Sequence, residues 1–319
     1  MKTRLSLLSL AGLLGLLSFM VACRQPTLTA ATMAEMTWWD HIARSLVQDN
    51  FLGYVIPLLI GVIGLFLRVR MLRFAILAFS IVYLGFVLGL RLSGLGAPST
   101  FIIFLNETGI KVNMSFYLTW LFLIMLGVFV GRLFCGWVCP MGAFQQFLFR
   151  KDMALKVSPR VHNWLRWLRY VVLVVMIITV VVWGVRWWGA NDPFRNLFRL
   201  SWELTSITGT VLLVLVLAGS LFVFAPWCKY VCPLGATLAL FSKLSLWKVK
   251  IHEAKCTDCK RCYKVDCDYQ AITPGGGGVK PKVNQLECTT CGECIAKCPE
   301  AAIKMTWFTR DIKEKKPSA

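Results

Sequence analysis

Long apolar runs alternate with short basic connections along most of the chain. The runs cover residues 5–22, 51–67, 74–90, 114–131, 170–185 and 208–224. None shows the period-two alternation of a half-buried strand, so each is predicted to form a helix. A helix needs about 20 predominantly apolar residues to cross a bilayer, and the tolerated range begins at about 17. The pattern therefore predicts an all-α polytopic membrane helical bundle with five to six spans.

The first run has two interpretations. Lys2 and Arg4 precede a leucine-rich stretch, so residues 1–23 are expected to be a signal sequence or the first transmembrane helix. The segment Met20-Val21-Ala22-Cys23 weakly resembles a lipoprotein cleavage site, which makes Cys23 a candidate for lipidation. The orientation of the later spans is the same in both cases.

The basic connections predict the orientation, because Lys and Arg accumulate on the cytoplasmic side of a membrane protein. The connections after the second and fourth runs hold more Lys and Arg than the connections on the opposite side: Arg68, Arg70 and Arg73, then Arg132, Arg150, Lys151, Lys156, Arg160, Arg166 and Arg169. We therefore expect a multi-pass protein of the bacterial cytoplasmic (inner) membrane, with its C-terminal part in the cytoplasm.

The composition agrees with a membrane protein. Hydrophobic residues make up 57% of the 319 residues and charged residues only 16%, against about 25% charged in a typical soluble protein. These values exclude intrinsic disorder and an ordinary cytosolic globule. The net charge of +19 could indicate nucleic-acid binding. The basic residues lie between apolar runs, however, so membrane lipids are the expected partner and nucleic acid is not.

The composition changes after Phe241. Residues 24–247 are expected to be the transmembrane bundle, residues 248–305 a small α+β domain that is polar and rich in Cys and Lys, and residues 306–319 a basic tail. A domain of fewer than about 70 residues with few large apolar side chains needs a staple such as a metal centre.

Cysteines in that small domain follow a known spacing. The run Cys288-x2-Cys291-x2-Cys294-x3-Cys298-Pro299 matches the bacterial ferredoxin pattern. An upstream run repeats it with one extra residue and with Asp268 in place of proline: Cys256-x2-Cys259-x2-Cys262-x4-Cys267. Paired CxxC motifs also bind zinc, but eight cysteines in two triplets plus two singles fit two [4Fe–4S] clusters of a bacterial-ferredoxin-like domain better.

In two-cluster ferredoxins the fourth cysteine of each run binds the other cluster. This rule predicts two crossed ligand sets: Cys256, Cys259, Cys262 and Cys298 for one cluster, and Cys288, Cys291, Cys294 and Cys267 for the other.

A second motif follows two of the apolar runs. Cys135-Gly-Trp-Val-Cys139-Pro140 comes after the fourth run, and Cys228-Lys-Tyr-Val-Cys232-Pro233 after the sixth, as an internal repeat. Both runs should lead inward, and residues four apart on a helix share a face, so the four thiols could meet at one point. Three interpretations stay open: a third metal or iron–sulfur centre, a redox-active dithiol, or buried cysteines that only pack.

Other chemistry is not indicated. His41, His162 and His252 all lie outside the apolar runs, so no haem held by paired histidines in the bilayer is expected. No residue is predicted to be catalytic.

Taken together, these motifs resemble the NapH/NosR-like membrane polyferredoxins, from about residue 51 to residue 305. The resemblance implies an electron-transfer subunit of a quinol-linked oxidoreductase system rather than a stand-alone enzyme. It would link the quinone pool or cytoplasmic donors to a periplasmic reductase in anaerobic respiration. Its implied partners are quinol or quinone, an iron–sulfur or cytochrome subunit and a terminal reductase. The functional positions that it carries over are Cys135, Cys139, Cys228, Cys232 and the eight cysteines of the C-terminal runs.

Two other classes of function are compatible with the same motifs. One is a redox-sensing, regulatory or metallocentre-maturation membrane protein. The other is a structural subunit whose clusters only stabilise the small domain.

Overall fold

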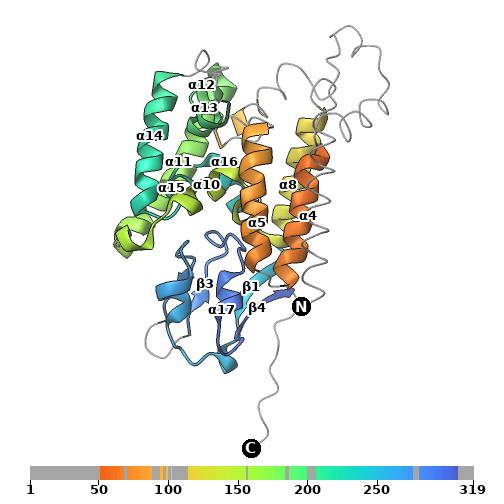
Figure 1. Cartoon of the computed structure of the whole chain (residues 1–319), viewed down its shortest axis with the longest axis vertical. Helices are drawn as coiled ribbons and strands as arrows, with labels where there is room; N and C mark the ends of the chain where they lie inside the picture. The colour runs from red at the N-terminus through yellow and green to blue at the C-terminus, as the bar shows by residue number, and fades with distance from the viewer. Residues whose placement is uncertain are drawn as a thin grey trace, which may run out of the picture.

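The computed structural model describes residues 51–67, 70–87, 94–95, 98–99, 102, 114–155, 157–183, 187–199, 206–275 and 280–307. Within these ranges a helical bundle lies above a small domain that contains the strands (Figure 1). The predicted first run, with Cys23, lies outside the described residues, as does the end of the basic tail after Trp307.

The apolar runs from residue 51 onward form helices. They are α4 (Phe51–Leu67), α5 (Arg70–Ser80) with its wider continuation η1 (Ile81–Val87), α8 (Met114–Val130), α11 (Pro159–Trp183) and α14 (Ile207–Phe222). Helix α11 begins well before its apolar run at residue 170, with Pro159 as its first residue. Proline suits that place, because the first N–H of a helix has no partner inside the helix. Two short helices follow α11: α12 (Trp187–Ala190) and α13 (Pro193–Arg199).

Within the described ranges, one helix is long and apolar enough to cross a membrane, Arg160–Trp183. Shorter apolar helices accompany it at Val55–Leu67, Met71–Val87, Leu118–Val130 and Ile207–Phe222. Helical structure in the bundle is therefore as predicted, and the number of spans stays a prediction.

Short helices from the two CxxxCP segments form the centre of the bundle. They are α9 (Leu133–Trp137) and α10 (Pro140–Leu148), then α15 (Pro226–Tyr230) and α16 (Pro233–Lys243). Helix α16 packs against α8 and α11. Trp137 and Trp227, each 2% exposed, belong to the same buried apolar cluster as the cysteines of these segments.

The small domain is built around two short antiparallel sheets. Strand β1 (Trp247–Ile251) pairs with β4 (Ile303–Trp307), and β2 (Ile272–Thr273) pairs with β3 (Lys282–Val283). A wide turn, η5 (Cys262–Asp266), and helix α17 (Glu293–Lys297) complete it. Its apolar core consists of Val249, Ile295 and Ile303, with four cysteines packed at its edge. A core this small agrees with the expectation that a bound centre stabilises the domain.

Candidate functional site

Each CxxxC segment consists of two short helices rather than one. The expectation that its cysteines share one helix face is therefore wrong. Helix α9 ends at Trp137, and Cys139 is the extended N-cap residue of α10 (φ −62°, ψ 115°). Cys232 takes the same position before α16 (φ −63°, ψ 111°). In both repeats the following proline causes the break, because it has no N–H to continue the first helix and is favoured at the start of the next.

The two repeats nevertheless bring Cys135, Cys139, Cys228 and Cys232 together, a group that we call the bundle quartet. All four are buried, with at most 9% of their surface exposed, and the charge of each thiolate would act on the others. Gly142 lies between the repeats: a Cβ placed on it would stand 3.7 Å from Cys228 Sγ and 3.9 Å from Cys139 Cβ.

Polar contacts to the quartet are few. Gln145 Nε2 donates to Cys228 Sγ at 3.4 Å, and the backbone N–H of Gly235 donates to Cys232 Sγ at 3.3 Å. Such contacts favour a thiolate over a neutral thiol, because the sulfur accepts.

The small domain holds two cavities, and the cysteines divide between them. The outer pocket, of about 30 Å³, is lined only by residues of the small domain, including Cys256, Cys259, Cys262 and Cys298. The inner pocket, of about 160 Å³, is lined by Cys267, Cys288, Cys291 and Cys294. These are the two crossed sets that the spacing predicts. Cys294 borders both cavities, so the two sites are neighbours.

Both cysteine loops turn in the same way. Asp258 and Thr290 stand two residues after the first cysteine of their runs, and both have a left-handed backbone (φ 53° and 52°). Lys260 and Gly292, two residues further on, repeat this conformation (φ 64° and 79°). Left-handed residues reverse the chain direction tightly, so each loop curls around its cavity. The two cysteine runs, which repeat in the sequence, therefore also share a loop conformation.

The inner pocket is the more buried of the two sites. Burial, together with the neighbouring Cys291, raises the pKa of Cys288 to about 12, and burial raises the pKa of Cys267 to about 11. Metal binding must displace these protons. In an iron–sulfur centre held here, the positive iron atoms would compensate the buried thiolates.

Among the described residues, no three His, Cys, Asp or Glu side chains converge as the ligands of a single metal ion do. Cysteine sulfurs are available at both cavities: four line the inner pocket, and the outer pocket has its predicted four with Cys294 beside them. In a four-iron cluster each thiolate binds a different iron, so its sulfurs stand further apart than the ligands of one zinc ion. The donor set therefore fits a four-iron cluster in each cavity.

The second wall of the inner pocket belongs to the bundle. Arg73 of α5 is 4% exposed and lies in this wall. Its Nε donates to the carbonyl oxygen of Gly136 at 3.1 Å, its Nη1 to Glu293 Oε1 at 3.0 Å and its Nη2 to Gln146 Oε1 at 2.6 Å. One guanidinium therefore joins the first CxxxC segment to the helix that carries Cys294.

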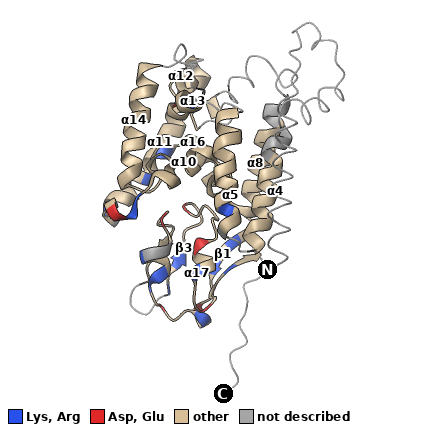
Figure 2. Ribbon diagram, in the orientation of Figure 1, with Lys and Arg blue, Asp and Glu red and all other residues tan. Residues whose placement is uncertain are grey.

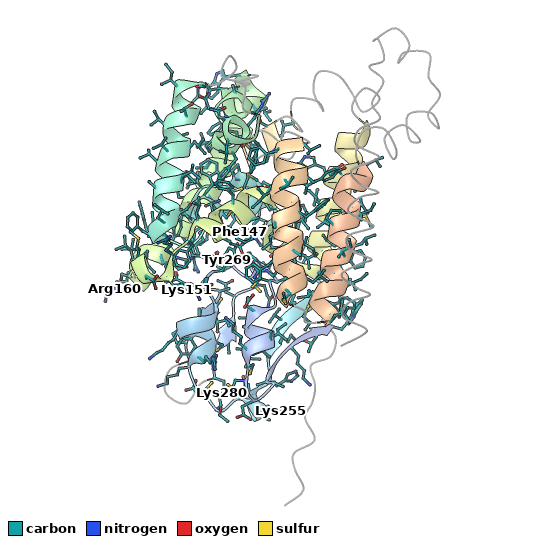
Figure 3. The ribbon with its side chains drawn as sticks, viewed as in Figure 1. Phe147, Lys151, Arg160, Lys255, Tyr269 and Lys280 are labelled. Atoms are coloured by element: carbon teal, nitrogen blue, oxygen red, sulfur yellow. The ribbon has the colours of Figure 1, made fainter. Side chains whose placement is uncertain are left out.

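Both CxxxC segments contact the loops of the inner pocket. Trp137 Nε1 donates to the carbonyl oxygen of Thr290 at 3.2 Å, and Lys229 Nζ donates to that of Asp268 at 2.7 Å. Tyr269 lies between the bundle and the small domain (Figure 3), where it is 6% exposed and packs on Phe224. The inner pocket thus lies between the outer pocket and the bundle quartet.

The close packing at Gly136 leads to a testable prediction. A Cβ on this residue would overlap the carbonyl oxygen of Thr289 in the inner-pocket loop. Gly136→Ala is therefore expected to push the loop away from α9 and to destabilise the protein by about 1–3 kcal/mol, the usual cost of overpacking. Thermal unfolding in detergent measures this cost. Gly219→Ala is the control, because its Cβ would meet only Pro226 Cγ at 3.7 Å. Equal stability of the two variants would contradict the close packing.

Sequence reasoning assigned several site residues to other roles. In the sequence, Arg73, Arg132 and Arg169 indicate only the orientation of the chain, yet each is at most 4% exposed at the contact between bundle and small domain. His162, which the sequence places outside the apolar runs, is 6% exposed and its Nδ1 lies 2.9 Å from Tyr230 Oη. In the sequence, position relative to the CxxxC motifs could have indicated two of these residues. Arg132 lies three residues before the first motif, and Tyr230 lies inside the second.

Comparisons with known proteins agree with this site. A family model described as a 4Fe-4S binding domain matches residues 112–168 and 205–252, which contain the bundle quartet. A 4Fe-4S dicluster domain matches residues 248–299. No solved structure matches the chain.

Relatives are found in several organisms. An uncharacterized protein of Methanocaldococcus jannaschii is 28% identical over 72% of this chain and 83% of its own length. The ferredoxin-type protein NapH of Haemophilus influenzae is 31% identical over 58% of this chain and 65% of its own length. The regulatory protein NosR of Pseudomonas aeruginosa is 29% identical over 88% of this chain, which spans only 44% of NosR.

The predicted resemblance is thereby confirmed: the chain is similar to the NapH/NosR-like polyferredoxins, and the matching 4Fe-4S domains support iron–sulfur binding.

Proposed function

We propose that this protein carries electrons between the cytoplasmic face of a membrane and its interior, through centres held in the outer pocket, the inner pocket and the bundle quartet. The observation that carries the proposal is the place of the inner pocket. It shares Cys294 with the outer pocket and contacts both CxxxC segments through Trp137 and Lys229. The three cysteine groups therefore follow one another in a line.

The residues of the two pockets suit this role. When bound, [4Fe–4S] clusters supply one-electron transfer at potentials that the protein tunes. Side chains of the bundle, among them Arg73, Gln146 and Phe224, line one side of the inner pocket. Arg73 and Glu293 fix the position of α17, and thus of Cys294. Cys259 is exposed, so the outer pocket is open to exchange with a soluble donor or acceptor.

For the bundle quartet we favour a third redox centre. Four buried thiols lie at one place, and two of them accept hydrogen bonds. This arrangement is more typical of the ligands of a redox centre than of cysteines that only pack. A redox-active dithiol is the second candidate.

The charge distribution supports a membrane bundle with the small domain in the cytoplasm. In the described ranges, Lys and Arg gather on the small domain and at the ends of the helices nearest to it (Figure 2), whereas Arg195 belongs to α13 at the other end of the bundle. Lys151, before α11, and Arg160, in the first turn of α11, are at this end of the bundle (Figure 3). Apolar side chains such as Val182 (64% exposed) and Leu215 (63% exposed) point outward from the helices. An apolar belt above a basic end is typical of a membrane protein with this end inside.

On this basis the protein would connect the quinone pool or cytoplasmic donors to a reductase. A quinol releases two electrons and two protons, and each cluster accepts one electron at a time. The ferredoxin-type name of the NapH relative and the name of the putative electron transport protein YccM of Escherichia coli favour a carrier. The name of the regulatory protein NosR favours a sensing role as the second candidate.

The test is a Cys139→Ser, Cys232→Ser double variant. A third four-iron centre predicts that iron falls from about twelve to about eight atoms per chain, and that a quinol analogue no longer reduces the remaining clusters. A dithiol predicts the same loss of reduction at an unchanged iron content of about eight.

The control for this variant is Thr237→Ser, which changes one half-buried methyl group on the same helix α16. Iron content and quinol-driven reduction that both equal those of the control would contradict a redox role of the quartet. An iron-free wild-type protein would contradict the carrier function as a whole.

A further inference from the structure

Arg132 occupies the space between the bundle quartet and the inner pocket. It lies two residues after the end of α8, as the N-cap residue of α9, and it is 2% exposed. Its Nη1 donates to the carbonyl oxygen of Leu286 at 2.9 Å, two residues before Cys288. On its other side, a Cβ placed on Gly235 would stand 3.4 Å from Arg132 Nη2. One guanidinium thus reaches from the inner-pocket loop to the turn that follows Cys232.

The charge of this guanidinium has no carboxylate partner in the described part of the chain. The nearby Glu287 forms its ion pair with Arg169, at 2.6 Å. The Nε of Arg132 is buried and makes no hydrogen bond to any described residue. A buried cation is costly unless an anion compensates it. Arg132, Arg169 and Glu287 together leave one positive charge uncompensated at this place.

Cysteines of both sites are the remaining source of negative charge. The charge of Arg132 acts on Cys135, Cys228 and Cys232 of the quartet and on Cys288 of the inner pocket. Burial lowers the pKa of Arg132, but Cys135, then Glu287 and two tyrosines, raise it above its usual value. The side chain is therefore charged at every pH at which the protein is folded.

We propose that Arg132 is a positioning residue that supplies one positive charge to both redox sites and thereby raises the reduction potential of the centres that they hold. The inference rests on the proposed function. Reduction adds a negative charge to a centre, and a fixed cation nearby stabilises the reduced form. Because the guanidinium lies between the two sites, its charge acts on both. It therefore stabilises an added electron in the inner-pocket centre and in a centre held by the bundle quartet.

The experiment is a redox titration of the purified protein, followed by low-temperature EPR, in three variants. Arg132→Gln removes the charge and is expected to shift the midpoint of the inner-pocket centre downward. Arg132→Lys keeps the charge and is expected to keep the midpoint near that of the wild type. Arg160→Gln, an exposed residue at the same end of the bundle, is the control and is expected to shift nothing.

An iron-replete Arg132→Gln variant with the wild-type midpoint would overturn the inference. If Arg132→Gln assembles no cluster, the Arg132→Lys variant tests the inference instead. Wild-type iron content and midpoint in Arg132→Lys support a role of the charge. Loss of iron in Arg132→Lys as well indicates that the shape of the side chain matters and overturns the inference. The proposed function fails separately, if the wild-type protein holds no iron or accepts no electrons.

Discussion

A Cys298→Ser variant is expected to lose the centre held by the first cysteine run and to keep the centre held by the second run, although Cys298 itself belongs to the second. The reason is the outer pocket, where Cys298 lies with Cys256, Cys259 and Cys262. Cys267→Ser should have the reciprocal effect, because Cys267 lies in the inner pocket with Cys288, Cys291 and Cys294. In each variant we expect a loss of up to about four of the iron atoms, the content of one cubane.

Matched variants identify which centre is lost. The EPR spectrum of Cys298→Ser should resemble that of Cys259→Ser, a ligand from the first run. The spectrum of Cys267→Ser should resemble that of Cys291→Ser, a ligand from the second run. The opposite pairing of spectra would refute the crossed assignment and favour two uncrossed sites. Iron and labile-sulfide analysis of the same samples checks the loss of one cluster.

The second large effect is expected at the ion pair between Arg169 and Glu287. Arg169 of α11 donates to Glu287 at 2.6 Å and to the carbonyl oxygen of Leu286 at 3.3 Å, so it attaches the small domain to the bundle. The two side chains are 0% and 6% exposed. Removal of one partner leaves a buried charge, which costs about 3–5 kcal/mol. Arg169→Gln should therefore loosen the small domain and expose the connection before β1 to proteases.

Limited proteolysis and thermal unfolding in detergent measure this effect. The control is Arg166→Gln, a half-buried residue one turn earlier on the same helix. An Arg169→Gln, Glu287→Gln double variant should recover part of the loss, since it leaves neither charge unpaired. A single variant as stable and as protease-resistant as the control would show that the pair does not hold the two parts together.

Motifs and periodicity predicted the kinds of element correctly, and the role of the cysteines as ligands stays a prediction. The apolar runs from residue 51 onward form helices in the described part of the chain, because no other local structure satisfies so long an apolar backbone without alternating side chains. The ferredoxin spacing led to the NapH/NosR-like family, and the crossed sets reappear as the linings of two cavities. Spacing is informative here because a tight loop between two cysteines leaves little conformational choice.

The prediction for the CxxxC segments was less successful. Regular helical spacing suggested one face for Cys135 and Cys139, but the chain breaks between them. The prolines at 140 and 233 were visible in the sequence, and their preference for the first position of a helix could have indicated the break. The meeting of two segments that lie some 90 residues apart in the chain could not be read from either of them.

By itself, the sequence determined which side chains are available. They are apolar side chains in runs long enough for helices, eight thiols at ferredoxin spacing and four thiols in a repeated CxxxCP motif. Only the tertiary structure decided where they meet. It turned Arg73, Arg132 and Arg169 from surface charges into buried contacts between bundle and small domain. The physical reason is that the spacing of residues in a motif restricts only the backbone of that short segment. The partner of a buried charge depends instead on how segments distant in the chain pack together.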